Sequence, residues 1–185
     1  MGHKRILGKT RDFITGREIT DTDDERYRQK LAHFLVEEKG YARDDIEVKR
    51  KLEMTIENER VLSMVDFVVK VHGKSFIVIR YGPGSLVTRE RPALAAARVL
   101  ESHQIPLTVV TNGEEAEILD TTSGEVIATG LGSIPEKSTA IEQLKNTELH
   151  RPSQKQREAE KRILSAYDWL EHSLECDNDW CSEEE

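Results

Sequence analysis

Two apolar runs joined by a tight turn decide the fold: MVDFVVKV at residues 64–71, HGK at residues 72–74 and SFIVIRYG at residues 75–82. β-Branched runs of this kind are typical of buried strands, so the segment predicts a central β-hairpin. Asp66 is the lone carboxylate inside the first run. Burying a carboxylate is costly unless it is paired or bound to a metal. Asp66 is therefore the first candidate for a functional residue.

The composition indicates a soluble globular protein. The chain has 185 residues, of which 37% are hydrophobic and 34% charged, which is enough for one domain with its own core. No run is long and apolar enough to span a bilayer, and residues 1–5 lack the apolar stretch of a signal peptide. We therefore expect a cytoplasmic protein without a membrane partner.

The negative charge is concentrated at the C-terminus. Residues 171–185 contain seven acidic and no basic side chains, so the remaining chain carries 27 basic against 28 acidic residues. The nearly neutral charge of residues 1–170 neither excludes nor predicts nucleic-acid binding. His172, Cys176 and Cys181 offer three zinc ligands without a nearby fourth, so a solvated tail is the preferred interpretation.

The order of the expected elements indicates an α/β fold with a mixed central sheet flanked by helices. Thr22 and Glu25 have the spacing of a capping box, and Gly40 ends the helix that they begin. Further strands are expected at 46–56, 107–111, 117–119 and 125–127, and a second helix at 89–102. The organisation follows: an irregular arm (1–21), an α/β domain (22–132), a linker (133–152), a C-terminal helix (153–174) and an acidic tail (175–185).

Four stretches resemble the N-terminal domain of type I restriction enzyme R (HsdR-like) proteins, above all its stand-alone versions. They are residues 25–30, residues 37–41, the Asp66 hairpin and residues 109–113. These domains belong to the PD-(D/E)xK nuclease superfamily, so the resemblance implies a restriction-endonuclease-like sheet. It also implies a site in which Glu25, Asp66 and the glutamate of an ExK triplet bind Mg²⁺, while the triplet lysine orients the attacking water.

The sequence departs from this pattern at the triplet. Arg80 stands at the glutamate position and Gly82 at the lysine position, while Ala95 and Val99 replace the family's Gln and Tyr on the second helix. A guanidinium removes one oxygen ligand and repels a divalent cation. We expect Arg80 to pair with Asp66 across the hairpin and to take the place of the metal.

Two functional hypotheses follow. The first is a catalytically inactive nuclease-like domain without a cofactor, which binds DNA or a protein partner. The alternative is an active Mg²⁺-dependent DNA endonuclease with a rearranged site, in which Glu25 and Asp66 bind the metal together with a migrated group. The residues considered for that group are Glu53, Glu57, Glu59 and Lys70. Glu25 also has a purely structural interpretation, in which its carboxylate caps the Thr22 N–H.

Overall fold

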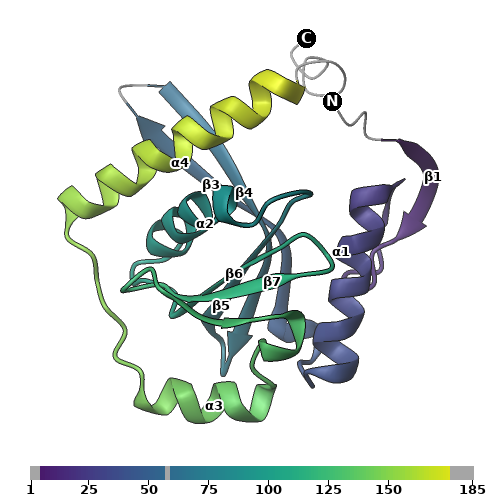
Figure 1. Cartoon of the computed structure of the whole chain (residues 1–185), viewed down its shortest axis with the longest axis horizontal. Coiled ribbons are helices and arrows are strands. Elements are labelled where there is room, and N and C mark those ends of the chain that lie inside the picture. The colour runs from purple at the N-terminus through teal and green to yellow at the C-terminus, as the bar shows by residue number, and fades with distance from the viewer. Residues whose placement is uncertain (1–4, 57–58, 176–185) are drawn as a thin grey trace.

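A six-stranded mixed sheet forms the centre of the protein (Figure 1). The computed structural model describes residues 5–56 and 59–175. The strands follow one another across the sheet in chain order and are antiparallel except for β5 and β6, which are parallel. Their bounds are β3 (Ile46–Ile56), β4 (Glu59–Val71), β5 (Lys74–Tyr81), β6 (Leu107–Thr111), β7 (Ala116–Asp120) and β8 (Val126–Thr129).

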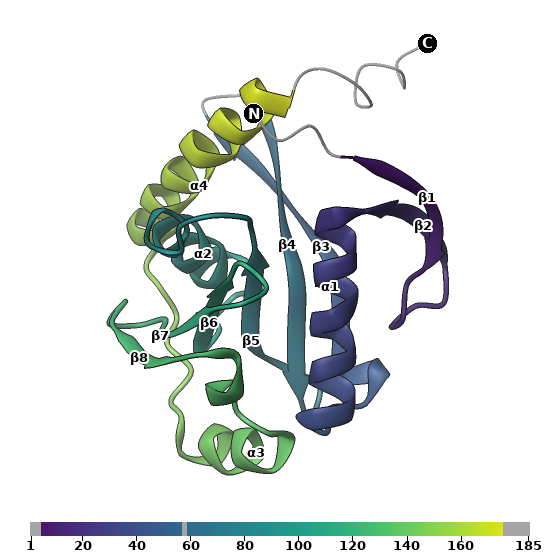
Figure 2. The same ribbon diagram turned by 45° about the vertical axis from the view of Figure 1, so that its right-hand side comes forward.

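Helices cover both faces of this sheet, as the sequence predicts (Figure 2). On one face lies α1 (Asp23–His33), which continues as a π-helical turn (Phe34–Glu38). On the other face lie α2 (Val87–Val99) and α4 (Gln154–Glu175), while α3 (Lys137–Asn146) contacts β4 and contributes Ala140 to the core cluster that contains Leu31 of α1. The long α2 crossover makes the parallel β5–β6 pairing possible.

Alternation along β5 divides the core into two layers. Ile77 and Ile79 join the cluster that contains Leu31 of α1, whereas Val78 joins the cluster of α2 alanines. Leu164 of α4 packs into this second cluster. The small alanine side chains let α2 lie close to the sheet.

The expected irregular arm at residues 1–21 contains regular structure that we did not predict. β1 (Ile6–Arg11) and β2 (Glu18–Thr22) form an antiparallel hairpin. Asp12 organises its turn by accepting hydrogen bonds from the N–H and the hydroxyl of Thr15, both at 2.7 Å. Gln29 ties the hairpin to α1 by donating to Asp12 and accepting from the Phe13 N–H. Apolar and polar residues do not alternate regularly in these two strands, so the sequence pattern did not predict them.

The expected linker at 133–152 was also wrong in part, because it contains α3. The C-terminal helix agrees with the prediction and is fixed to α2 by polar contacts. Arg157 donates to the Val99 and Glu101 carbonyls at 2.8 and 2.6 Å, so it caps the end of α2. Glu160 bridges two arginines of α2 at 2.6 and 2.9 Å.

The C-terminal predictions fall largely outside the described residues. These include the tail at 176–185 and, with it, the two cysteines of the zinc hypothesis. Of the helices that the structure describes, none combines the length and the apolarity that a membrane crossing requires.

Candidate functional site: the Asp66 cluster

Asp66 lies where β5 diverges from β4, one residue beyond the last registered pair, Phe67–Ile79. Its carboxylate is buried, with the residue only 6% exposed. Oδ1 accepts a hydrogen bond from Arg28 Nε at 2.5 Å, and Oδ2 accepts one from the Tyr81 N–H at 2.7 Å. Protein donors therefore hold both carboxylate oxygens.

The ion-pair partner of Asp66 is Arg28 of α1, which corrects the expected pairing with Arg80. Asp66 and Arg80 do lie on adjacent antiparallel strands. However, Ile79 packs in the α1 layer and Tyr81 stacks on Tyr27 of α1. Alternation therefore directs Arg80 toward the opposite face of the sheet, away from the Asp66 carboxylate.

A local break in the β3–β4 ladder accompanies this geometry. Val48 pairs with Phe67 and Arg50 with Val65, but no pair is formed between Lys49 and Asp66. Lys49 has φ +51°, a left-handed conformation that is costly for a residue with a side chain. Its ammonium lies 2.9 Å from Glu25 Oε2. The break thus accompanies an unpredicted cation beside Glu25.

Glu25 is buried and belongs to the same cluster. Its Oε1 accepts from Gln29 Nε2 at 2.9 Å, and its Oε2 lies 4.0 Å from Arg28 Nη1. Thr22 caps α1 by accepting from the Glu25 N–H at 3.1 Å. Only this half of the expected capping box is formed, because the Glu25 carboxylate is directed toward Lys49 and Gln29.

Arg28 is the electrostatic centre of the cluster. Burial works against its charge, but the charge and hydrogen bond of Asp66 outweigh burial and raise the pKa of Arg28 above its usual value. Its guanidinium lies 5.0 Å from the centre of the Tyr81 ring, and the Tyr81 hydroxyl donates to Asp24 at 3.2 Å. Burial and then Asp24 raise the pKa of Tyr81 to about 12. The ring of Tyr81 thus packs against the guanidinium of Arg28. Tyr81 is the residue between Arg80 and Gly82 in the sequence.

Because Gly82 has no side chain, the guanidinium of Arg89 lies close to its backbone. A Cβ at this position would lie 2.1 Å from Arg89 Nη1. Arg89, from the first turns of α2, also donates to the Pro83 carbonyl at 3.0 Å. The family's lysine position therefore holds no side chain of its own, and an arginine from α2 occupies the adjoining space.

The migrated groups considered for the alternative hypothesis lie elsewhere where the structure describes them. Glu53 pairs with Arg60 at 3.1 Å, and Lys70 pairs with Glu47. Residue 57 and the side chain of residue 59 are outside the described part. Ala95 and Val99 are buried in the α2 layer.

The donor set does not suit Mg²⁺. Among the described side chains, no three carboxylate, imidazole or thiol groups lie together in an arrangement that holds a metal ion. The guanidinium of Arg28 lies against Asp66 and near Glu25, the two carboxylates that the resemblance implies as metal ligands. Mg²⁺ requires oxygen ligands in octahedral geometry, and this cluster supplies two carboxylates that are already paired.

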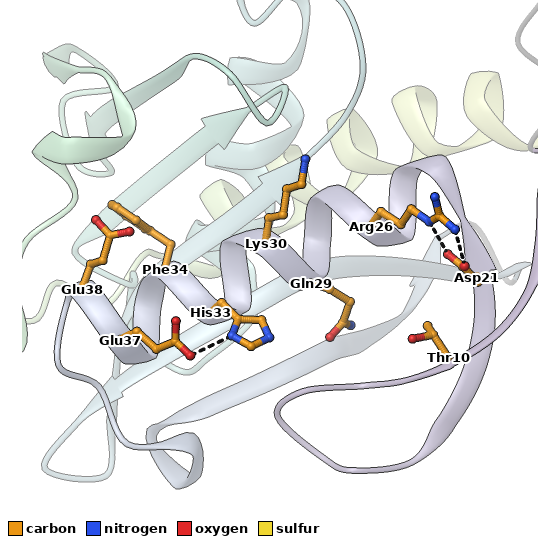
Figure 3. A pocket seen from close by; sticks show the side chains of 9 residues that line it. All are labelled: Thr10, Asp21, Arg26, Gln29, Lys30, His33, Phe34, Glu37 and Glu38. Atoms are coloured by element: carbon orange, nitrogen blue, oxygen red, sulfur yellow. Dashed lines mark hydrogen bonds and ion pairs between the residues drawn. The ribbon is translucent and has the colours of Figure 1, made fainter.

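A separate groove of about 550 Å³ runs along the outer face of α1, beneath the β1–β2 hairpin (Figure 3). Several of its polar groups contact one another within the groove: Arg26 pairs with Asp21 at 2.8 Å, and His33 Nδ1 lies 2.9 Å from Glu37 Oε1. The groove contains neither Asp66 nor Glu25 and is not the family's metal position. Its lining residues are Thr10, Asp21, Arg26, Gln29, Lys30, His33, Phe34, Glu37 and Glu38.

Comparison with known proteins agrees with this fold. Residues 23–135, which make up 113 of the 185 residues, match the family described as the type I restriction enzyme R protein N terminus. No curated protein and no solved structure matches the chain. The matched region contains α1, the Asp66 hairpin, α2 and β6 to β8. The chain belongs to the family of type I restriction enzyme R protein N-terminal domains.

Proposed function

We propose that this protein is a nuclease-like domain that no longer cleaves with a metal ion and that acts by binding a partner. The observation that carries the proposal is the Arg28 guanidinium held against Asp66 with Glu25 nearby. Arg80 and Gly82 support it, because neither supplies the carboxylate or the amine of the family's triplet.

The energetics of the cluster favour Arg28 over a divalent ion. Breaking a buried ion pair by removing one partner costs about 3–5 kcal/mol, and a metal would also have to shed part of its hydration shell. A metal bound about 4 Å from a retained guanidinium would be repelled by about 8 kcal/mol at an effective dielectric of about 20. Coordination of the metal by two carboxylates, without a third, would not offset these free-energy costs.

The charges around the cluster favour a protein partner over nucleic acid. Lys49 pairs with Glu25, Arg26 with Asp21, and Arg50 with Glu47. Affinity for nucleic acid comes mainly from cations that neutralise phosphates, and a cation already paired with a carboxylate contributes less. DNA binding through this face is therefore expected to be weak and to disappear at moderate salt.

A titration calorimeter distinguishes this proposal from an active nuclease. Wild type and Asp66→Asn are titrated with Mg²⁺ and with Mn²⁺, and both are incubated with supercoiled plasmid in the same buffers. Glu53→Gln serves as the matched control, because Glu53 is an exposed carboxylate paired with Arg60. The proposal predicts equal, non-saturating heats and intact plasmid for all three proteins. Saturable binding or nicking that Asp66→Asn alone abolishes would establish the rearranged, active site instead.

A further inference from the structure

The two edges of the central sheet differ in how well they are protected. β3 carries charged side chains at five of its eleven positions and is interrupted at Lys49. Such features discourage the addition of another strand. β8 consists of Val126, Ile127, Ala128 and Thr129 and has no charged residue. Val126 is 43% exposed and Ile127 57%, so this edge presents apolar side chains to solvent.

The backbone of β8 has hydrogen-bonding capacity on its outer side. Gly130 N–H donates to the Ala116 carbonyl at 2.7 Å, so Gly130 faces β7 and alternation turns Thr129 outward. The Thr129 carbonyl accepts from the Ser133 hydroxyl at 2.7 Å, and the Thr129 N–H points to the same outer side, because Thr129 and Glu117 form a non-hydrogen-bonded pair. A bulge near Ile127 shortens the edge but leaves this N–H in place.

An acidic pair lies one strand inside this edge. Thr129 is directly opposite Glu117 of β7, so both side chains are on the same face of the sheet. Burial, then the charge of Glu90 and the hydrogen bond with Glu90, raise the pKa of Glu117. Glu117 Oε2 is buried and has no hydrogen-bond partner among the described residues. The charged groups that raise the pKa of Glu117, Glu90 and Glu115, are both acidic.

We propose that β8 is a docking edge for an extended, basic segment of a partner protein, which adds as a seventh strand. The segment would accept from the Thr129 N–H and place a Lys or Arg beside Thr129. From there a long cationic side chain crosses the small threonine to reach Glu117. A second copy of this chain is a poorer occupant, because β8 has no basic side chain to offer to Glu117.

The test uses a fluorescein-labelled ten-residue peptide in which Arg alternates with Val, added to the full chain and followed by anisotropy. A peptide with Glu in place of Arg controls for strand propensity. Saturable binding of the Arg peptide, and none of the Glu peptide, is expected. Thr129→Pro removes the outward N–H without touching the β7 ladder and should weaken binding by about tenfold, the size of one hydrogen bond.

Three further proteins make the outcome specific. Glu117→Gln should weaken the Arg peptide severalfold, while Glu53→Gln on the opposite edge should leave it unchanged. Asp66→Asn should also bind normally, which separates this inference from the proposed function. If Thr129→Pro does not fold, Thr129→Lys replaces it, since a lysine there satisfies Glu117 in cis and should exclude the peptide. Wild-type affinity in a folded Thr129 variant, or a dimer that either Thr129 variant dissociates, would overturn the proposal.

Discussion

Replacing Arg28 with methionine tests whether its guanidinium holds the Asp66 cluster together. Methionine keeps an unbranched apolar stem, so the change removes mainly charge and hydrogen bonds. The two side chains of the Arg28–Asp66 pair are 18% and 7% exposed. Loss of one partner from such a pair costs about 3–5 kcal/mol. Asp66 keeps the Tyr81 N–H and Glu25 keeps Lys49, so we expect a loss near the lower limit, about 3 kcal/mol.

Urea unfolding followed by circular dichroism measures this loss. In thermal unfolding of a protein of this size, a loss of about 3 kcal/mol corresponds to a fall in Tm of roughly 6–12 °C. Arg26→Met is the matched control, because Arg26 lies on the same helix in an exposed pair, with a side chain that is 59% exposed. Exposed pairs contribute about 1 kcal/mol or less. The control should therefore lose little stability.

The pH dependence of the stability loss and its size in a double variant show whether the loss comes from the Arg28 charge. The destabilisation by Arg28→Met should shrink in acid, because protonated carboxylates no longer need a cation. Adding Asp66→Asn to Arg28→Met should recover part of the loss, because the uncompensated charge is removed with its partner. An Arg28→Met protein as stable as Arg26→Met, or a double variant that loses the sum of both single losses, would refute the assignment of Arg28 as the cation of the cluster.

Three further variants test other contacts. Gly113→Ala should destabilise the protein by about 1–3 kcal/mol in urea unfolding, since the new Cβ would lie 2.5 Å from the Tyr27 ring at φ +93°. Because the pKa of Tyr81 rises from 10.0 to about 12 on folding, the unfolding free energy should fall as pH rises through that range. Tyr81→Phe should lack that fall, and ultraviolet titration should show one fewer late-titrating phenol. Glu117→Gln should raise Tm at pH 7 and leave it unchanged at pH 4, because a raised carboxyl pKa costs stability only where the group would ionise.

The periodicity of the sequence was sufficient for most of the sheet and for α1, α2 and α4. The apolar runs around Asp66 predicted β5 and the part of β4 from residue 64 onward, and the 46–56 strand agrees with β3 at both ends. These elements bury long, regular apolar faces, so local pattern and tertiary packing agree. β1 and β2 were missed because the hairpin is held by polar contacts with α1 rather than by a strong apolar period. α3 was missed because its first residue is tied to Lys39 and Asp45, which are distant in the sequence.

The site was less predictable because its contacts cross between elements. The identity of Asp66 and Glu25 as neighbours followed from the family resemblance, but the partner of Asp66 did not. Cross-strand register placed Arg80 opposite Asp66. The Asp66 carboxylate, beside the ladder break at Lys49, is instead directed toward Arg28 of α1. Arg28 follows Glu25 by three residues on α1, and this spacing was the available signal that both face the same cluster.

Anomalous scattering from a crystal of the protein soaked in Mn²⁺ shows whether a metal or the Arg28 guanidinium occupies the Asp66 cluster. We expect no anomalous peak at the Asp66 carboxylate and a guanidinium of Arg28 that remains hydrogen-bonded to Asp66 Oδ1. A peak coordinated by Asp66 and Glu25, with Arg28 displaced from both, would contradict this expectation. That result would show that the cluster still functions as a metal site.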